Sequence, residues 1–174
     1  MSYKSVLPFA EKSTYKDGSS LTLTSTIAST LWGRVYDTND SNNRPRQVRI
    51  VHLKSAVTAA KVVLEFDSDE GDTGRQITAI CDTEGAKGKP LTDQIPADTV
   101  LAANDLVCVI ESGFCECTAG AAFDAGADLM SNATGKLIAA TAGKAIIARA
   151  EEAATGADEV VGVYVYPGIP KTNP

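Results

Sequence analysis

The four cysteines are the residues whose spacing is easiest to test against known chemistry. Cys108, Cys115 and Cys117 lie close together in the sequence, and Cys81 lies further back. A structural zinc site usually contains a Cys-x-x-Cys pair, and this sequence has none. Cys115 and Cys117 are two residues apart, so a strand would place both on one face. The spacing therefore favours buried structural thiols over a metal site or a redox pair.

An acidic run of Asp67, Asp69, Glu70 and Asp72 offers carboxylates that a calcium ion would bind. An EF-hand loop requires glycine at its sixth position and glutamate at its twelfth. Counted from Asp67, the sixth residue is Asp72 and the twelfth is Thr78. The run is therefore interpreted as the solvated tip of a hairpin, and an adventitious cation site is the alternative.

Residues 85–90, Gly-Ala-Lys-Gly-Lys-Pro, are superficially similar to a phosphate-binding loop. A P-loop requires four residues between its glycines and a Ser or Thr after the lysine. Here two residues separate the glycines, and Pro90 removes a backbone donor. We expect an ordinary loop over residues 83–93.

His52 is the only histidine of the chain and lies between Val51 and Leu53. Nucleophilic catalysis needs a Ser or Cys beside the base and an orienting carboxylate, and no such pattern surrounds it. A structural histidine is the expectation. The sequence gives no positive evidence for catalysis, so we expect a protein that is not an enzyme, with no catalytic residue, no metal site and no cofactor.

Composition weakens several other classes of function. The chain has 174 residues and a net charge of −6 at pH 7. An acidic chain without a basic block is a poor ligand for phosphate backbones, so we expect no direct contact with nucleic acid. The sequence has no apolar stretch long enough for a transmembrane helix and no recognisable signal peptide at its start. These features predict synthesis in the cytoplasm and no membrane partner.

The elements that must position these residues are strands. Alternating or β-branched segments predict strands over residues 47–54, 61–67 and 76–81. Residues 55–60 are compatible with the start of a short helix, and periodicity does not decide the matter. The segment 37–46 is almost free of apolar residues and predicts an exposed loop. An Asp17-Gly18 pair before an alternating run predicts a hairpin.

The second half of the chain has glycines at short and fairly regular intervals. A strand is predicted from Leu106 to Glu111, then a turn at Ser112-Gly113, then a strand from Phe114 to Thr118. Further turn signals follow at Gly120, Gly126, Gly135, Gly143 and Gly156. Turns spaced by about ten residues are typical of a small β-barrel or sandwich. Residues 148–154 are compatible with a helical turn or a strand.

Half of the ten aromatic residues lie within the first 36 residues. One interpretation is that they fill a single core. The other is an extended N-terminal arm that docks on a partner through aromatic anchors. Under the second interpretation the predicted partner-contact residues are Tyr3, Phe9, Tyr15, Trp32, Arg34 and Tyr36.

The predicted fold class is mainly β. We expect an N-terminal arm and hairpin region over residues 1–47, a β-rich region over 48–96, a barrel-like or sandwich-like module over 97–168, and a surface tail over 169–174.

The segment 96–168 resembles the head decoration proteins, or capsid cement proteins, of bacteriophages. Its first part, PADTVLAANDLVCV, resembles the opening strand of that family, with Asn104-Asp105 where the family has Gly-Asp. The closing part, ARAEEAATGADEVVGVYV, resembles the family's last element through Ala148, Glu151, Ala153 and Ala154. Between them, the matching positions are Thr118, Ala119, Gly120, Gly126, Asp128, Leu129, Ser131, Gly135 and Lys136.

This resemblance implies a structural protein that binds the outer surface of an icosahedral capsid and stabilises it. It also implies a homotrimer, the major capsid protein as partner, and a place on the outside of the virion after synthesis in the bacterial host. Two alternatives stay open: another virion component, such as a head-fibre base, a tail protein or a vertex protein, and a small β-barrel that binds a ligand.

Overall fold

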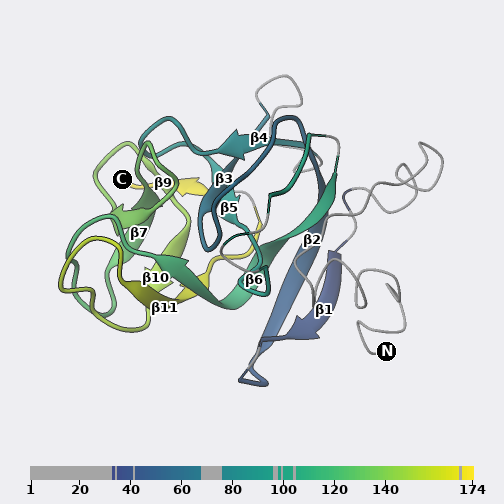
Figure 1. Ribbon diagram of the computed structural model, residues 1–174. Helices are drawn as coiled ribbons and strands as arrows, with labels where there is room; N and C mark the ends of the chain where they lie inside the picture. Colours follow the sequence, from purple (N-terminus) through teal and green to yellow (C-terminus); the bar gives the residue numbers. More distant parts are fainter. Residues whose placement is uncertain are drawn as a thin grey trace.

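The regular elements that the structure describes are all strands. The computed structural model describes residues 33, 35–40, 42–67, 76–95, 98, 100–103, 105–168 and 170–174, and within these ranges no helix occurs (Figure 1). The strands are β1 (Val35–Asn39), β2 (Pro45–Leu53), β3 (Val63–Phe66), β4 (Gln76–Ile80), β5 (Gly88–Pro90), β6 (Leu106–Thr118), β7 (Asp128–Ser131), β8 (Leu137–Ala139), β9 (Ala145–Ile146), β10 (Ala148–Ala150), β11 (Val160–Val165) and β12 (Lys171–Thr172).

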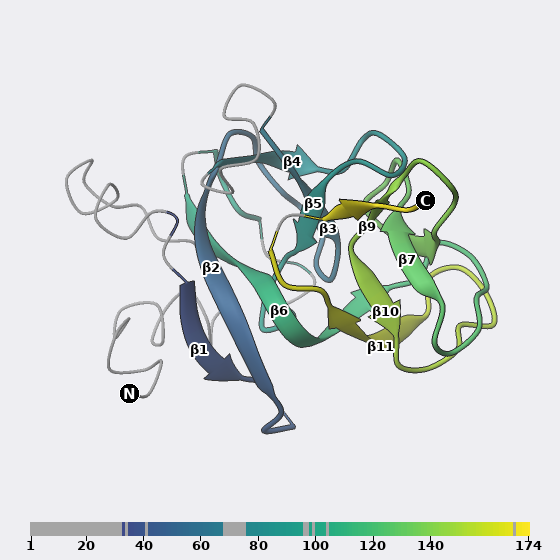
Figure 2. The same cartoon turned by 180° about the vertical axis from the view of Figure 1, so that it is seen from behind.

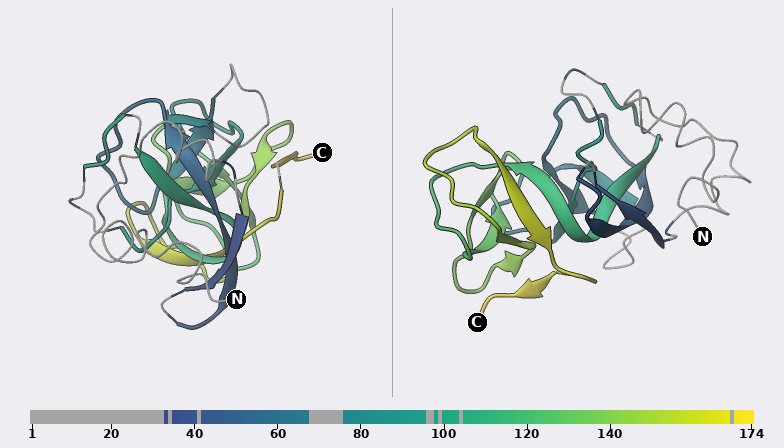
Figure 3. Two further views of the ribbon diagram at one scale, coloured as in Figure 1. Left: turned by 90° about the vertical axis from the view of Figure 1, so that its right-hand side faces the viewer. Right: turned by 90° about the horizontal axis from the view of Figure 1, so that it is seen from below.

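Ten of these strands form one sheet that closes on itself twice. Its order is β5-β3-β4-β2-β6-β11-β10-β7-β8, and β1 pairs with the free side of β2. An antiparallel bridge from Leu91 to Val109 brings the chain after β5 back to β6, and a parallel bridge from Ala119 to Leu137 brings β8 back to the end of β6. Two small barrels result, and both contain β6, which runs from one to the other (Figures 1 and 3).

The N-terminal barrel consists of β2, β4, β3, β5 and the first half of β6, and side chains fill its interior. The alternation in 47–54 predicted a strand there, and β2 confirms it; β3 and β4 confirm the strands predicted within 61–67 and 76–81. The fully buried residues of this interior include Val51, Leu53, Leu64, Ile77, Leu91, Val107 and Val109. Each such side chain contributes about 1.5–3 kcal/mol through burial.

The C-terminal barrel consists of the second half of β6 with β11, β10, β7 and β8. The glycine-spaced turns of the sequence produce it, because Gly126, Gly135 and Gly143 all have positive φ angles, which glycine adopts without a steric penalty. The second core includes Cys115, Cys117, Leu129, Leu137, Ala148, Val161 and Val163. The predictions of a mainly β fold and of a small C-terminal barrel are confirmed, whereas the N-terminal arm lies outside the described residues.

Strand β6 corrects the prediction of two strands separated by a turn at Ser112-Gly113. The strand continues for 13 residues. Its register against β2 shifts between Gln47 and Val48, so that Glu111 has no partner there. This β-bulge adds one residue to the strand. Even-numbered residues before it and odd-numbered residues after it therefore point to the same face of the sheet.

The consequence of the bulge is that one face of β6 stays with one core. Leu106, Cys108 and Ile110 belong to the same hydrophobic cluster as Cys115 and Cys117, although the first three have even numbers and the last two odd. Without the extra residue, the two cysteines would lie on the opposite face of the strand.

Other segments also differ from the sequence-based expectations. Within the predicted loop 83–93, residues 88–90 form β5. The predicted loop 37–46 is largely strand, because residues 37–39 belong to β1 and residues 45–46 to β2, and only the residues between them form the turn of the β1–β2 hairpin. Residues 55–60 contain a β-bridge at Val57 and no helix. Of the two possibilities for 148–154, residues 148–150 form strand β10. In the tail, β12 pairs with β9 (Figure 2). The predicted hairpin at Asp17-Gly18 lies outside the described residues.

Gly113 provides a test of the β6 bend. Its φ angle is +100°, and an added Cβ would lie 2.7 Å from Cα of Arg46 and from the carbonyl oxygen of Pro45. We expect Gly113→Ala to lower the free energy of unfolding by about 3 kcal/mol or more, because backbone strain and a backbone clash add together. Gly143 also has a positive φ of +78°, but its added Cβ would meet nothing within 4 Å. Gly143→Ala is therefore the matched control, with an expected loss of about 1 kcal/mol. Equal losses in urea unfolding would contradict the steric account.

Candidate interaction surface

A buried ion pair joins Arg46 of β2 to Asp93, which lies in the segment after β5, where the two barrels meet. Nη1 of Arg46 donates to Oδ1 of Asp93 at 2.8 Å, and the two side chains are 1% and 5% exposed. The same carboxylate accepts the backbone N–H of Glu116 through Oδ2 at 3.0 Å. Arg46 also donates to the carbonyl of Phe114 at 3.4 Å. The pair therefore fixes the backbone of β6 at the start of the C-terminal barrel.

The charge of Asp93 is stabilised by its partners. Burial alone would raise the pKa of Asp93, but the Arg46 guanidinium and the hydrogen bonds from Arg46, Gln94 and Glu116 hold it below its usual range. Removing one partner of such a pair leaves the other charge buried and uncompensated, which costs more than the pair itself contributes.

Lys89 makes a second connection at the same junction. Its side chain is almost fully buried, and Nζ donates to the carbonyl of Glu111 at 2.7 Å and to that of Tyr166 at 2.8 Å. The Glu111 carboxylate accepts from Arg49 at 2.8 Å and from the backbone N–H of Gly168 at 3.2 Å. The bulge of β6 is thereby bonded to β5, to β2 and to the segment that follows β11.

Burial lowers the pKa of Lys89 to about 8, while the Glu111 carboxylate opposes this effect and the Arg49 guanidinium adds to it. The ordinary pKa of a lysine is about 10.4. Lys89 thus loses its proton more easily in the folded chain than in the unfolded one, and this difference links stability to pH.

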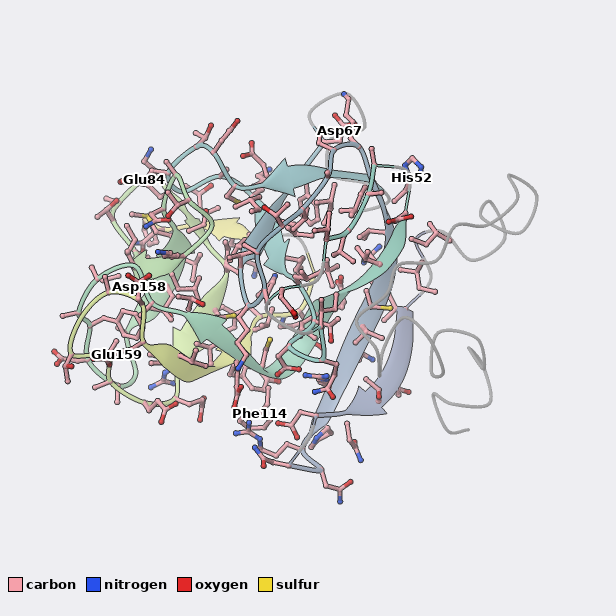
Figure 4. The ribbon with its side chains drawn as sticks, in the orientation of Figure 1. His52, Asp67, Glu84, Phe114, Asp158 and Glu159 are labelled. Atoms are coloured by element: carbon pink, nitrogen blue, oxygen red, sulfur yellow. The ribbon has the colours of Figure 1, made fainter. Side chains whose placement is uncertain are left out.

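Beside this junction lies a row of arginine and aromatic side chains on the outer surface. Phe114 of β6 and Tyr164 of β11 are cross-strand partners, and their rings meet edge to face with centroids 5.4 Å apart. The guanidinium carbon of Arg44 lies 4.4 Å from the centroid of Phe114. Arg149 of β10 is the partner of Tyr164 on its other side. Figure 4 shows Phe114 beside the β1–β2 hairpin, with His52 and Asp67 at the opposite end of the molecule.

We call the outward side of β6 and β11, with these two arginines, the β6–β11 face. It continues past Tyr164 to Val160, which is paired with Thr118. Tyr164 is 37% exposed and Val160 is 50% exposed. Between them, Nζ of Lys61 binds the carboxylate of Glu116 at 2.6 Å. Lys61 has a φ of +54°, an uncommon conformation for a residue with a side chain, and such strain concentrates at functional sites.

The composition of this face suits contact with another protein. Tyrosine and arginine are enriched among the residues that carry binding energy at interfaces. Tyrosine buries a large area with little loss of side-chain freedom, and arginine offers several hydrogen-bond donors on a planar group that stacks on aromatic rings. Here both rings stand on strands of closed barrels, and packing and a cation–π contact hold them. The face therefore presents two packed aromatic rings, flanked by Arg149 and by Arg44, whose guanidinium is paired with the carboxylate of Asp40.

The side chains predicted as partner contacts all lie outside the described part of the structure. Tyr3, Phe9, Tyr15, Trp32 and Arg34 lie outside the described residues, and so does the side chain of Tyr36. The backbone of Tyr36 belongs to β1 and pairs with Val48. The role of these six residues stays a prediction.

The four cysteines are buried and form no disulfide. Burial raises the pKa of Cys81 to about 12. The contact between Cys115 and Cys117, together with burial, holds the pKa of Cys115 well above its usual range. Such thiols are poor nucleophiles at neutral pH, and the prediction of buried structural thiols is confirmed.

The other candidate residues take structural positions. His52 lies in β2, in register with Gln76 and Leu106. Asp67 is buried, with its carboxylate 3.3 Å from Nζ of Lys54, while the rest of the acidic run lies outside the described residues. Across the described residues, no group of three or more His, Cys, Asp or Glu side chains is arranged to hold a metal ion. The described part of the chain also has no helix that would span a membrane.

The β6–β11 face was not among the sequence-based expectations, although the alternation within each of its strands was present in the sequence. The same alternation that places Cys115 and Cys117 inward places Phe114 and Glu116 outward. In β11, Val163 points inward and Tyr164 outward. The strand pairing that brings Phe114 beside Tyr164 depends on long-range register and was not visible in the sequence.

The ion pair at the junction gives a second prediction. We expect Asp93→Asn to lower the free energy of unfolding by about 3–5 kcal/mol, because it leaves the Arg46 charge buried without a counter-ion. Asp158→Asn is the control, since the pair of Asp158 with Lys136 involves a carboxylate that is 72% exposed, and exposed pairs contribute about 0–1 kcal/mol. Urea unfolding of both variants measures the difference, and similar losses would contradict the assignment.

Lys89 gives a prediction of pH dependence. Between pH 8 and 10.5 the folded chain binds fewer protons at this residue than the unfolded chain, so its contribution to stability increases with pH. From pH 7 to pH 9 we expect the free energy of unfolding of the wild type to increase by about 1 kcal/mol relative to Lys89→Met. Comparing the two chains at each pH removes the titration of the cysteines. A difference that does not change with pH would contradict the burial of a titrating lysine.

The chain was compared with known protein families, curated proteins and solved structures. No family profile matches the sequence, and no curated protein matches it. A solved structure of similar shape is the N base of the head fibre protein gp8.5 of bacteriophage phi29, with 17% sequence identity and a TM-score of 0.43. The match covers 70% of this chain and 94% of the phage chain. A TM-score of this size does not establish a common fold.

Proposed function

We propose that this chain is a non-enzymatic structural component of a bacteriophage virion. In this role it binds the outer surface of the icosahedral capsid as a decoration, or cement, protein and stabilises the shell. Its partner is the major capsid protein, and it acts as a homotrimer without a cofactor.

The observation that carries the proposal is the place of the residues on which the sequence resemblance rests. Ala119 makes the bridge to Leu137 that closes the C-terminal barrel. Gly126 and Gly135 form turns with positive φ. Leu129 pairs with Ala148 across β7 and β10. Residues that were matched as a pattern are thus the ones that build one compact unit, which supports descent from the decoration proteins rather than chance similarity of composition.

The physical character of the surface also supports this role. A protein that clamps a shell needs rigid elements and a complementary surface rather than titratable groups. The β6–β11 face offers two aromatic side chains on strands of the C-terminal barrel, with Arg149 on the neighbouring strand β10 and Arg44 in the β1–β2 turn. Many copies on one particle bind with avidity, so each individual contact can be modest. A net charge of −6 disfavours adhesion to DNA and to other acidic particles.

A second role in the same particle is the base of a head fibre or a vertex protein. Both roles use a rigid β body on the capsid surface, and they differ in the number of copies per particle. Quantitative mass spectrometry of purified virions separates them, because a cement protein covers the whole shell and a fibre base or vertex protein occupies few positions.

The proposed function is tested by adding the purified chain to expanded capsids of the phage that encodes it. We expect the chain to co-sediment with the shells and to raise the temperature at which they open, as measured by light scattering. Shells that neither retain the chain nor gain heat resistance would overturn the proposal.

The β6–β11 face is tested by variants in the same assay. We expect Tyr164→Ala to weaken shell binding about tenfold or more, because truncating an aromatic anchor at an interface costs over 1 kcal/mol. Val100→Ser is the control, since Val100 is a more exposed apolar residue, 66% exposed, and lies outside this face; its effect should stay within about twofold. Equal effects of the two variants would place the interface elsewhere.

A further inference from the structure

Within the described residues, β1 leaves one side of the ten-stranded sheet unpaired, whereas the two ends of the sheet's path are closed by bridges. The Leu91–Val109 and Ala119–Leu137 bridges return both ends of the ten-stranded path to β6. Within the described residues, β1 pairs with β2 alone. Figures 1 and 2 show the β1–β2 hairpin projecting beyond the two barrels, with β1 on its outer side. An edge that no described strand occupies is a template for pairing with another chain.

The alternation of hydrogen-bonded and non-hydrogen-bonded pairs along the β1–β2 hairpin determines which backbone groups of β1 point away from β2. Asp40 donates its N–H to the carbonyl of Arg44 across the turn, so these two residues form a hydrogen-bonded pair. In an antiparallel ladder such pairs alternate with pairs that are not hydrogen-bonded. Asp37 is therefore in a pair of the second kind with Gln47. The N–H and C=O groups of Val35, Asp37 and Asn39 consequently face away from β2.

The sequence of β1 does little to protect this edge. Proteins usually block an edge with lysine, proline, a bulge or a covering segment. The strand reads Val-Tyr-Asp-Thr-Asn, and its register with β2 is unbroken. Its single charge is Asp37, whose carboxylate accepts a hydrogen bond from Gln47 at 2.9 Å. Val35 on the same side of the strand is 40% exposed.

We propose that β1 binds an extended segment of another protein, which adds to the sheet as a further strand. This inference concerns a second surface and goes beyond the proposed function. The segment carries a basic residue opposite Asp37 and an apolar residue opposite Val35. Backbone hydrogen bonds supply the affinity in this mode of recognition, and the side-chain positions supply the specificity.

A second copy of this chain fits the edge less well. Antiparallel pairing of two β1 strands over their full length places Asp37 opposite Asp37 of the other copy. Like charges directly opposite each other destabilise a sheet. The net charge of −6 on each copy adds a repulsion of the same sign. A basic strand from another protein meets neither difficulty.

The test uses a random library of extended peptides as the probe, so that it does not depend on capsid binding. We expect the wild type to enrich peptides with Lys or Arg at one position and an apolar residue two positions away. Asp37→Lys should enrich acidic residues at that position instead. A library that yields no peptide of this pattern would overturn the inference while leaving the shell-binding assay unaffected.

Two variants of one residue separate backbone pairing from side-chain contact. Asp37→Pro removes an outward N–H that β2 does not use, and proline is tolerated on edge strands. It should weaken binding of the enriched peptides at least about tenfold, because it removes a ladder hydrogen bond and adds a clash. Asp37→Ala keeps the N–H and should weaken binding only about twofold to fivefold. Equal binding by both variants would overturn strand addition.

Hydrogen exchange of the free chain gives an independent check. We expect the amides of Val35, Asp37 and Asn39 to exchange quickly and to become protected when an enriched peptide binds. Protection already present in the free chain would mean that another segment of the chain occupies the edge, and would overturn the inference. If Asp37→Pro lowers the unfolding midpoint in urea, Asn39→Pro, which removes the next outward N–H, replaces it.

Discussion

The constraint on which the structure depends is that one strand, β6, belongs to two closed barrels. Val107 and Val109 face one core, while Cys108 and Ile110 face the other. Every position in this part of the strand is therefore buried. The buried groups at the junction, Arg46 with Asp93 and Lys89 with two carbonyls, lie where β6 passes from one barrel to the other. Nζ of Lys89 satisfies the carbonyl of Glu111, the residue that the bulge leaves without a partner in β2.

The local part of this fold was predictable from sequence, because it depends on period and on glycine. Alternation identified β2, and glycine spacing indicated the C-terminal barrel. The errors arose where long-range pairing outweighs local preference. Gly113 has the character of a turn residue, yet its positive φ serves a bend within a continuous strand. Lys89 lies between Gly88 and Pro90, two residue types that are typical of loops, yet its segment pairs with β3.

The candidate surface was also predictable only where it depends on the pattern within one strand. The inward positions of Cys115 and Cys117 followed from their spacing. The outward row of Phe114, Tyr164 and Arg149 is formed by three different strands, and a pattern within one strand does not give its neighbours. The pairing of Arg46 with Asp93, 47 residues apart, was equally inaccessible. Sequence reasoning therefore located secondary structure and left the contacts between distant elements undetermined.

The end of the chain is part of the C-terminal barrel's outer layer. Thr172 pairs with Ala145 in β9, and Asn173 exchanges two backbone hydrogen bonds with Gly143 and Lys144. Trimming these last residues by a protease would expose the backbone of β9 and create a new unpaired edge on the C-terminal barrel. Fusion of a tag at this end, by contrast, would add chain beyond a strand that is already anchored, on the barrel remote from the β1–β2 hairpin (Figure 2).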